Sequence, residues 1–310
     1  MTTFYAMPGN EHLATVLAGR LGGSVATLAL HRFPDRESVV RLEPPSRAAD
    51  AVLVCTMDDP DPKLVPLLFA ARTLREEGAR SVGLVAPYLA YMRQDRRFMP
   101  GESVSSRHFA AILSEHFDWL VTVDPHLHRY RSLDDIYSIQ TAVAHSAPAI
   151  AQWIVASVPK PVIIGPDEES RQWAQEVATL VDAPCMVMAK QRLGDRDVSI
   201  STADMTEWRD RTPVLIDDIV STGATLAAQL AHLRESGLPP AICVGVHGLF
   251  ADDAVARLER AGASYIVTTT TIPGAFAGID ISESIAASIR TMDGGEQRTS
   301  NDAHTSKWTA

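Results

Sequence analysis

The chain has 310 residues, enough for one large or two ordinary domains, and 46% of them are hydrophobic against 21% charged, as in soluble globular proteins. Its 28 basic and 38 acidic residues give a net charge of −10, which argues against binding to nucleic acid or to an acidic membrane surface. No basic-then-apolar N-terminal signal and no membrane-length apolar run is present. Three widely spaced cysteines in apolar segments (Cys55, Cys185 and Cys243) predict free thiols and a reducing, cytoplasmic setting.

The first half of the chain alternates apolar, strand-like segments with segments of helical periodicity. We predict strands at 4–6, 38–42, 51–56, 81–86 and 119–123, and helices at 12–21, 64–78 and 104–116. This alternation is typical of α/β domains with parallel sheets and right-handed crossovers.

Two polar loops follow predicted strands of this half. Residues 87–97 hold two tyrosines and three arginines, which suit an anionic ligand that stacks, although a solvated basic loop is the structural alternative. Asp124-Pro125-His126-Leu127-His128 follows the strand at 119–123. Two histidines beside an aspartate can hold a metal ion, but histidines are more often structural, and the spacing leaves both interpretations open.

The second half repeats the alternation after a crossing at about 135–157. Strands are predicted at 162–165, 185–189, 214–216, 242–247 and 265–269, and helices at 171–181, 252–261 and 281–292. The connection at 190–208 is long and charged, as lids and binding loops often are. We therefore divide the chain into domains at 1–145 and 146–285, followed by the end of the last helix and a polar, disordered tail at 286–310.

The most informative stretch is 214–226, which reads as strand, loop and helix. The loop Ser221-Thr222-Gly223-Ala224-Thr225 places unpaired N–H groups at a helix N-terminus, where a phosphate binds well. Asp217 and Asp218 would repel that phosphate unless they serve ribose hydroxyls or a metal ion, so the pattern indicates a sugar phosphate. A capped helix after a tight turn is the structural alternative.

The segment from Asp217 to Thr225 resembles the signature shared by type I phosphoribosyltransferases and ribose-phosphate pyrophosphokinases. Over residues 4–290 the whole pattern resembles the second family, because further motifs follow in the same order. These motifs are Phe33-x-Asp35-x-Glu37, Arg93-Gln94-Asp95-Arg96, Asp124-x-His126, Pro166-Asp167, Lys190-Gln191-Arg192, His247-Gly248-Leu249-Phe250 and Thr271-Ile272-Pro273. The resemblance implies two tandem type I phosphoribosyltransferase-like domains, each a parallel sheet flanked by helices.

The resemblance also implies a reaction, in which the diphosphoryl group of ATP moves to the C1 hydroxyl of ribose 5-phosphate and AMP is released. Lys190 and Arg192 would be catalytic on a mobile loop, and Mg²⁺ would be held at His126 and Asp167. The residues implied for ATP are Phe33, Asp35, Glu37, Arg93, Gln94, Asp95 and His126. Those implied for ribose 5-phosphate are Arg192, Asp217, Asp218, Ser221, Thr222, Gly223, Ala224 and Thr225. In this family the adenine loop at Phe33 reaches a neighbouring subunit, which implies a homo-oligomer built from dimers.

Three of the motifs depart from the family pattern. Glu168-Glu169-Ser170 stands where small residues are common, Arg36 where glycine is usual, and Ser221 where many members carry aspartate. Two other functions share parts of the pattern. One is a phosphoribosyltransferase that uses phosphoribosyl pyrophosphate, and the other is a catalytically silent regulatory homologue, which would be expected to lose Lys190 and Arg192.

Overall fold

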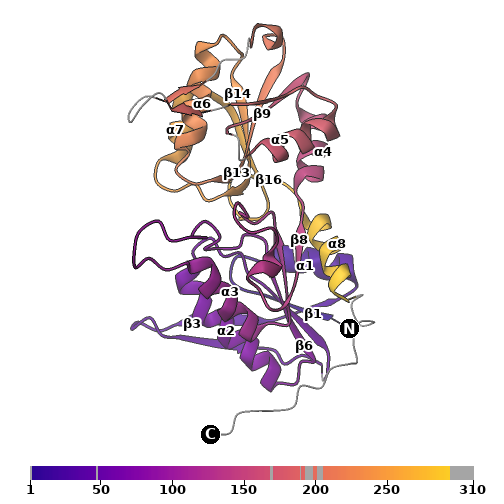
Figure 1. Ribbon diagram of the computed structural model, residues 1–310. Coiled ribbons are helices and arrows are strands. Elements are labelled where there is room, and N and C mark those ends of the chain that lie inside the picture. Colours follow the sequence, from indigo (N-terminus) through magenta and orange to yellow (C-terminus); the bar gives the residue numbers. More distant parts are fainter. Residues whose placement is uncertain are drawn as a thin grey trace.

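The computed structural model describes residues 2–46, 48–167, 170–188, 190–192, 198–200 and 205–293. It has two α/β units, drawn one above the other in Figure 1, which we call the first and second units in chain order. The tail predicted to be disordered lies outside the described residues.

The first unit is built on a six-stranded sheet in the order β2-β1-β5-β6-β7-β8, with parallel pairing throughout. Its strands are β1 (Thr2–Ala6), β2 (Ser24–Ala26), β5 (Asp50–Val54), β6 (Ser81–Ala86), β7 (Trp119–Val123) and β8 (Gln140–Ala144). The helices between them are α1 (Glu11–Leu21), α2 (Pro60–Glu76) and α3 (Ser105–His116), with a short 3₁₀ turn, η1 (Leu133–Asp135). An antiparallel hairpin of β3 (Leu28–Arg32) and β4 (Ser38–Leu42) is inserted after β2.

The second unit repeats this plan with the order β10-β9-β13-β14-β15-β16, again with parallel pairing. Its strands are β9 (Pro161–Gly165), β10 (Cys185–Val187), β13 (Thr212–Val220), β14 (Ala241–Gly248), β15 (Ala263–Thr269) and β16 (Ala277–Ile279). Its helices are α5 (Arg171–Val181), α6 (Ala224–Glu235) and α7 (Ala254–Ala261). The hairpin inserted after β10 consists of β11 (Lys190–Arg192) and β12 (Val198–Ile200), and a 3₁₀ turn, η2 (Met205–Trp208), follows it.

The tandem architecture implied by the resemblance is therefore confirmed. In both units the second strand lies at the edge, the first strand lies beside it, and the hairpin is inserted at the same place. The 190–208 connection, predicted only as a long loop, contains two short strands and the 3₁₀ turn.

The central strands are apolar because helices cover both faces of each sheet, as parallel sheets require. All five residues of β7 are buried, and so are the last four of both β5 and β9. Cys55 and Cys243 are buried free thiols and Cys185 is a half-buried one. No helix among the described residues is long and apolar enough to span a bilayer.

Two helices cross between the units. Helix α4 (Ala147–Ser157) follows the first sheet but packs against α5 of the second unit, whereas α8 (Ser282–Asp293), the last described element, returns to pack against α1, β7 and β8. Figure 1 shows α8 beside α1 in the first unit. Ile285 and Ile289 of α8 are fully or almost fully buried in an apolar core that includes residues of both units.

Candidate active site

A cavity of about 330 Å³ lies where the loop after β7 meets the carboxyl ends of β9 and β13. We call it the site cavity. Parallel sheets present ligand sites at the carboxyl ends of their strands, which is where this cavity lies. Its walls include four of the predicted site residues, namely His126, Asp167, Asp217 and Asp218.

The two aspartates lie within β13, not after it. The strand continues to Val220, and Asp217 pairs with Gly245 of β14. Burial, together with the charges of Asp218 and Asp167, raises the pKa of Asp217 to about 8. Successive side chains of a strand normally point to opposite faces of the sheet, yet Asp217 and Asp218 both line the same cavity.

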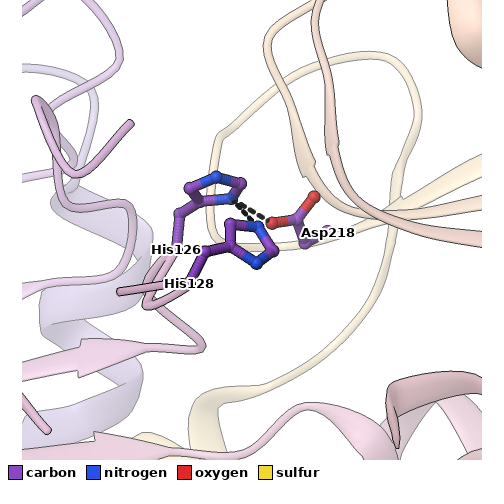
Figure 2. A group of neighbouring side chains, drawn as sticks. All are labelled: His126, His128 and Asp218. Atoms are coloured by element: carbon purple, nitrogen blue, oxygen red, sulfur yellow. Dashed lines mark hydrogen bonds and ion pairs between the residues drawn. The ribbon is translucent and has the colours of Figure 1, made fainter. Parts of the chain in front are cut away.

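A histidine pair from the first unit meets Asp218 of the second, as Figure 2 shows. The Nδ1 atom of His126 lies 2.6 Å from Oδ2 of Asp218 and 3.0 Å from Nε2 of His128. Burial acts to raise the pKa of Asp218, but the hydrogen bond from His126 and the nearby histidine charges outweigh it, so that pKa lies below its usual value. One potential ligand atom from each of these three residues lies within 4.8 Å of the others, an arrangement that can hold a metal ion.

The loop that carries the histidines is fixed by Asp124, whose backbone has a φ of 33°. Its carboxylate accepts hydrogen bonds from the Ser146 amide at 2.8 Å and from Nδ1 of His145 at 3.1 Å. The hydrogen bond to Asp124 raises the pKa of His145. The buried His247 of β14 lies with Nε2 3.4 Å from the Asp124 carbonyl oxygen and Nδ1 3.0 Å from Thr271 Oγ1. The motif at His247 thus helps to place the loop at His126.

The predicted phosphate loop connects β13 to α6. Gly223 precedes the helix with a φ of 68°, a left-handed conformation that glycine adopts without strain, and no side chain caps the helix N-terminus. The first-turn N–H groups of α6 therefore lack a side-chain cap and suit an anion. The amides of Leu249 and Phe250 both donate to the Val220 carbonyl at 3.0 Å. The second half of the motif that begins at His247 therefore supports the phosphate loop.

The Pro166-Asp167 motif follows β9, and Asp167 lines the cavity. Oδ1 of Asp167 accepts the Ser170 amide at 3.1 Å, and Ser170 Oγ donates to the Asp167 carbonyl at 2.6 Å. Ser170, one of the departures from the family pattern, thus closes this turn. Glu168 and Glu169 lie outside the described residues.

The residues of the motif predicted to bind ATP differ in their exposure to solvent. Arg93 is exposed and Gln94 is half-buried. Asp95 is buried, and its carboxylate accepts both hydrogen bonds from Nη1 of Arg129, at 2.8 and 2.9 Å. The carboxylate of Asp95 therefore links the loop at Arg93 to the loop at His126.

The predicted adenine residues form the turn of the β3–β4 hairpin. The amide of Glu37 is bound by Asp35 Oδ1 at 3.1 Å, and the Phe33 side chain is 44% exposed, with its ring edge-on to His31. Arg36 adopts a φ of 74°, which accounts for the usual glycine there. None of these residues lines the site cavity, and Figure 1 shows the hairpin projecting from the first unit.

Lys190 and Arg192 begin and end β11, opposite Ile200 and Val198 of β12. Their side chains lie outside the described part of the structure, so their predicted catalytic role stays a prediction.

Four further residues contribute to the site. His128 was identified beside His126, but only as half of an undecided pair. His145, Glu176 and Trp173 line the cavity without having been predicted. His145 could have been predicted from its place directly after β8, because the neighbouring strand β7 ends at the histidine loop. Glu176 and Trp173 carry no such signal, because they lie on an ordinary amphipathic helix.

Comparisons with known proteins agree with this architecture. The pattern that defines the N-terminal domain of ribose phosphate pyrophosphokinase matches residues 2–116, and that of the phosphoribosyl transferase domain matches residues 132–282. The ribose-phosphate pyrophosphokinase of Methanopyrus kandleri is 33% identical over 90% of this chain and 95% of its own length. That of Saccharolobus solfataricus is 34% identical over 83% and 89%. The crystal structure of phosphoribosylpyrophosphate synthetase from Mycobacterium smegmatis shares the fold, with a TM-score of 0.81 at 23% identity over 95% of this chain and 99% of that one.

Proposed function

Because the chain belongs to the ribose-phosphate pyrophosphokinase family, we propose that the residues of its site cavity catalyse transfer of the diphosphoryl group of ATP to the C1 hydroxyl of ribose 5-phosphate. In this reaction the hydroxyl oxygen forms a bond to the β-phosphorus, the bond from that phosphorus to the α–β bridging oxygen breaks, and AMP leaves. The hydroxyl proton is released. The observation that supports the proposal is that a phosphate-type loop without a side-chain cap and the two aspartates of β13 meet the histidine loop of the other unit.

The sugar phosphate would be held by β13 and α6. The loop from Ser221 to Thr225 would bind the 5-phosphate through the first-turn amides, while Asp217 and Asp218 accept hydrogen bonds from ribose hydroxyls. Asp218 is already bound to His126, so sugar binding would exchange one of these hydrogen bonds for another. The sugar would thus be positioned against the first unit.

The charge of the cavity supports a requirement for a divalent cation. Five carboxylates (Asp124, Asp167, Glu176, Asp217 and Asp218) line it, and the raised pKa of Asp217 reflects this crowding as well as burial. Hard oxygen donors of this kind fit Mg²⁺, and His126 and Asp167, which both line the cavity, would help to hold it with the acids of β13. When bound, Mg²⁺ would neutralise phosphate oxygens and polarise the transferring group.

The nucleotide would enter from the first unit. The exposed Arg93 would face the phosphates, while Asp95 would act through Arg129 as a positioning residue. Lys190 and Arg192, on the β11–β12 hairpin, would close over the transferring group and balance charge that grows in the transition state.

The proposed reaction is tested by incubating the protein with ATP and Mg²⁺ and measuring AMP by chromatography, with ribose 5-phosphate or with ribose. We expect the wild-type protein to release AMP only when ribose 5-phosphate is present, and we expect Asp218→Asn to lose this activity. Retained ATP binding without turnover would favour the silent homologue. AMP release that ignores the sugar would contradict the proposed reaction.

We also propose that the β3–β4 hairpin serves the site of a second copy, so that the active form is a homo-oligomer. The support is that Phe33 is exposed on a projecting turn and does not line its own chain's cavity. Phe33→Ala and Lys190→Ala should each be inactive alone but regain activity when unfolded and refolded together, since mixed oligomers contain one intact site. Lys190→Ala mixed with Arg192→Ala is the control, because both changes affect the same chain's site. No recovery in the first mixture, or an active monomer by light scattering, would overturn this assembly.

A further inference from the structure

A second cavity, of about 400 Å³, lies between the two units, away from the residues of the site cavity. Its walls include Asn10 and Leu13 of the first unit, and Thr270 and Ala277 of the second. Its volume falls in the range of small-molecule sites. No residue of the proposed reaction lines it.

The second cavity is the counterpart of the site cavity under exchange of the two units. In the site cavity, the second unit supplies α5 and the end of β13, and the first supplies the loop between β7 and β8. In the second cavity, the first unit supplies α1 and the end of β5, and the second supplies the loop between β15 and β16. These elements hold equivalent places in the two strand orders.

Individual residues correspond as well. Trp173 and Glu176 are the third and sixth residues of α5, and Leu13 and Val16 are the third and sixth of α1. All four line their respective cavities.

The register and the turn geometry extend the correspondence. Leu215 of β13 pairs with Ile164 of β9, and Leu53 of β5 pairs with Tyr5 of β1, so the two leucines hold equivalent positions. Three residues after each leucine, Thr56 takes the place of Asp218. The Thr270 amide donates to the carbonyl of Ile279 at 2.9 Å, as the Asp124 amide donates to that of Ala144 at 3.2 Å. Thr270 therefore replaces Asp124, and Asp280, which follows β16, stands where His145 follows β8.

The second cavity is lined by fewer charged residues than the site cavity. Threonines replace Asp218 and Asp124, and Val16 replaces Glu176. Among the residues that line the second cavity, His12 and Asp280 are the titratable ones, and none is a lysine or an arginine. Without such cations, and with a carboxylate at the rim, the cavity does not suit a phosphate.

Most polar groups of the walls are already bound within the protein. Asn10 Oδ1 accepts the Thr56 amide at 2.9 Å, and Asn10 Nδ2 donates to the Met7 carbonyl at 3.2 Å. Thr56 Oγ1 donates to the Thr271 carbonyl at 2.7 Å, which ties the two units together beside the cavity. The cavity is therefore preformed and offers mainly apolar contacts.

Asp280 gives the cavity its polar specificity. Its two oxygens accept the Ser282 amide and hydroxyl at 2.8 and 3.0 Å, and Arg20, which does not line the cavity, lies 3.6 Å from Oδ2. Each carboxylate oxygen has more than one acceptor site, so a ligand N–H group can still bind at the rim.

We propose that the second cavity binds an uncharged, flat heterocycle with an amino group, the class to which adenine and adenosine belong, and that it excludes phosphorylated compounds. Both units form its walls, so an occupant contacts both sides of the same interface that holds the site cavity. This binding does not depend on the proposed reaction.

Adenosine tests the proposal by calorimetric titration in the presence of saturating ATP, with ribose 5-phosphate left out so that no turnover occurs. Leu13→Trp introduces the side chain that α5 carries at the equivalent position and should fill the cavity. Thr15→Trp, on an exposed position of the same helix, is the matched control. We expect adenosine to bind the wild-type protein and Thr15→Trp alike, and Leu13→Trp to raise the Kd about tenfold or more. Ala277→Leu, on the opposite wall, should act in the same direction.

Absence of adenosine binding, or equal affinity in Leu13→Trp and Thr15→Trp, would overturn the proposal, as would inorganic phosphate competing with adenosine. These results are separate from AMP release. A failure of the proposed reaction would leave adenosine binding sensitive to Leu13→Trp, whereas a failure of the second cavity would leave sugar-dependent AMP release intact.

Discussion

Arg129→Ala should destabilise the protein through Asp95. The side chain of Asp95 is 1% exposed, and both of its oxygens accept hydrogen bonds from Arg129, whose own side chain is 44% exposed. Removal of one partner of a buried pair leaves an uncompensated charge, which costs roughly 3–5 kcal/mol when both partners are buried. Since water already reaches Arg129, we expect a smaller loss, of about 2–3 kcal/mol, in the free energy of unfolding.

Urea denaturation followed by fluorescence measures this loss. Arg131→Ala is the control, because Arg131 is 92% exposed and its ion pair with Asp135 lies at the surface. Its removal should change the unfolding curve little. Asp95→Asn combined with Arg129→Ala should recover much of the stability, because the stranded group is then neutral. If Arg129→Ala unfolds like Arg131→Ala, or if the double variant is no more stable than Arg129→Ala, the buried-charge explanation is wrong.

Gly83→Ala should cost about 3 kcal/mol of stability in a urea titration, because its Cβ would lie 2.0 Å from the ring of Trp119, and a smaller residue at 119 should recover part of that loss. Gly223→Ala should raise the KM for ribose 5-phosphate in the AMP assay, since a φ of 68° costs a non-glycine residue about 1 kcal/mol; an unchanged KM would remove the loop from the phosphate site. Lys190→Ala should lower kcat with little change in ATP binding, and a pure KM effect would refute its role in the transition state. Burial lowers the pKa of His247, so the unfolded state binds its proton more readily and stability falls as the pH drops below the ordinary value near 6.5. His247→Gln should reduce the loss of stability between about pH 7.5 and 5.5, by up to about 1.4 kcal/mol, and an unchanged pH dependence would exclude this cause.

Much of the fold follows from local patterns. The apolar run of β7 and the periodicity of α5 predict the observed boundaries without error, because buried parallel strands and amphipathic helices carry strong signals. The short strands β2, β3 and β16 were not predicted, since three to five partly exposed residues carry no period to detect. The end of β13 was placed too early, because its two acidic residues look like a loop but lie within the strand, where Asp217 pairs with Gly245 of β14.

Several residues of the site cavity were indicated by the sequence, but their contacts were not. The sequence indicated His126 and Asp218 separately, and only the packing of two sheets brings residues 92 positions apart to 2.6 Å. The role of Asp95 was also hidden. An acid between arginines looks like a ligand contact, and only its burial under Arg129 reveals a positioning role.

The return of α8 to the first unit affects the order in which the chain can mature. Ile285 and Ile289 complete a core begun by Phe4 and Leu17, so the first unit lacks part of its covering until residues 285–289 have left the ribosome. During synthesis the N-terminal half therefore exposes an apolar strip. We expect a fragment ending near residue 145 to aggregate unless a peptide corresponding to the last helix is supplied in trans.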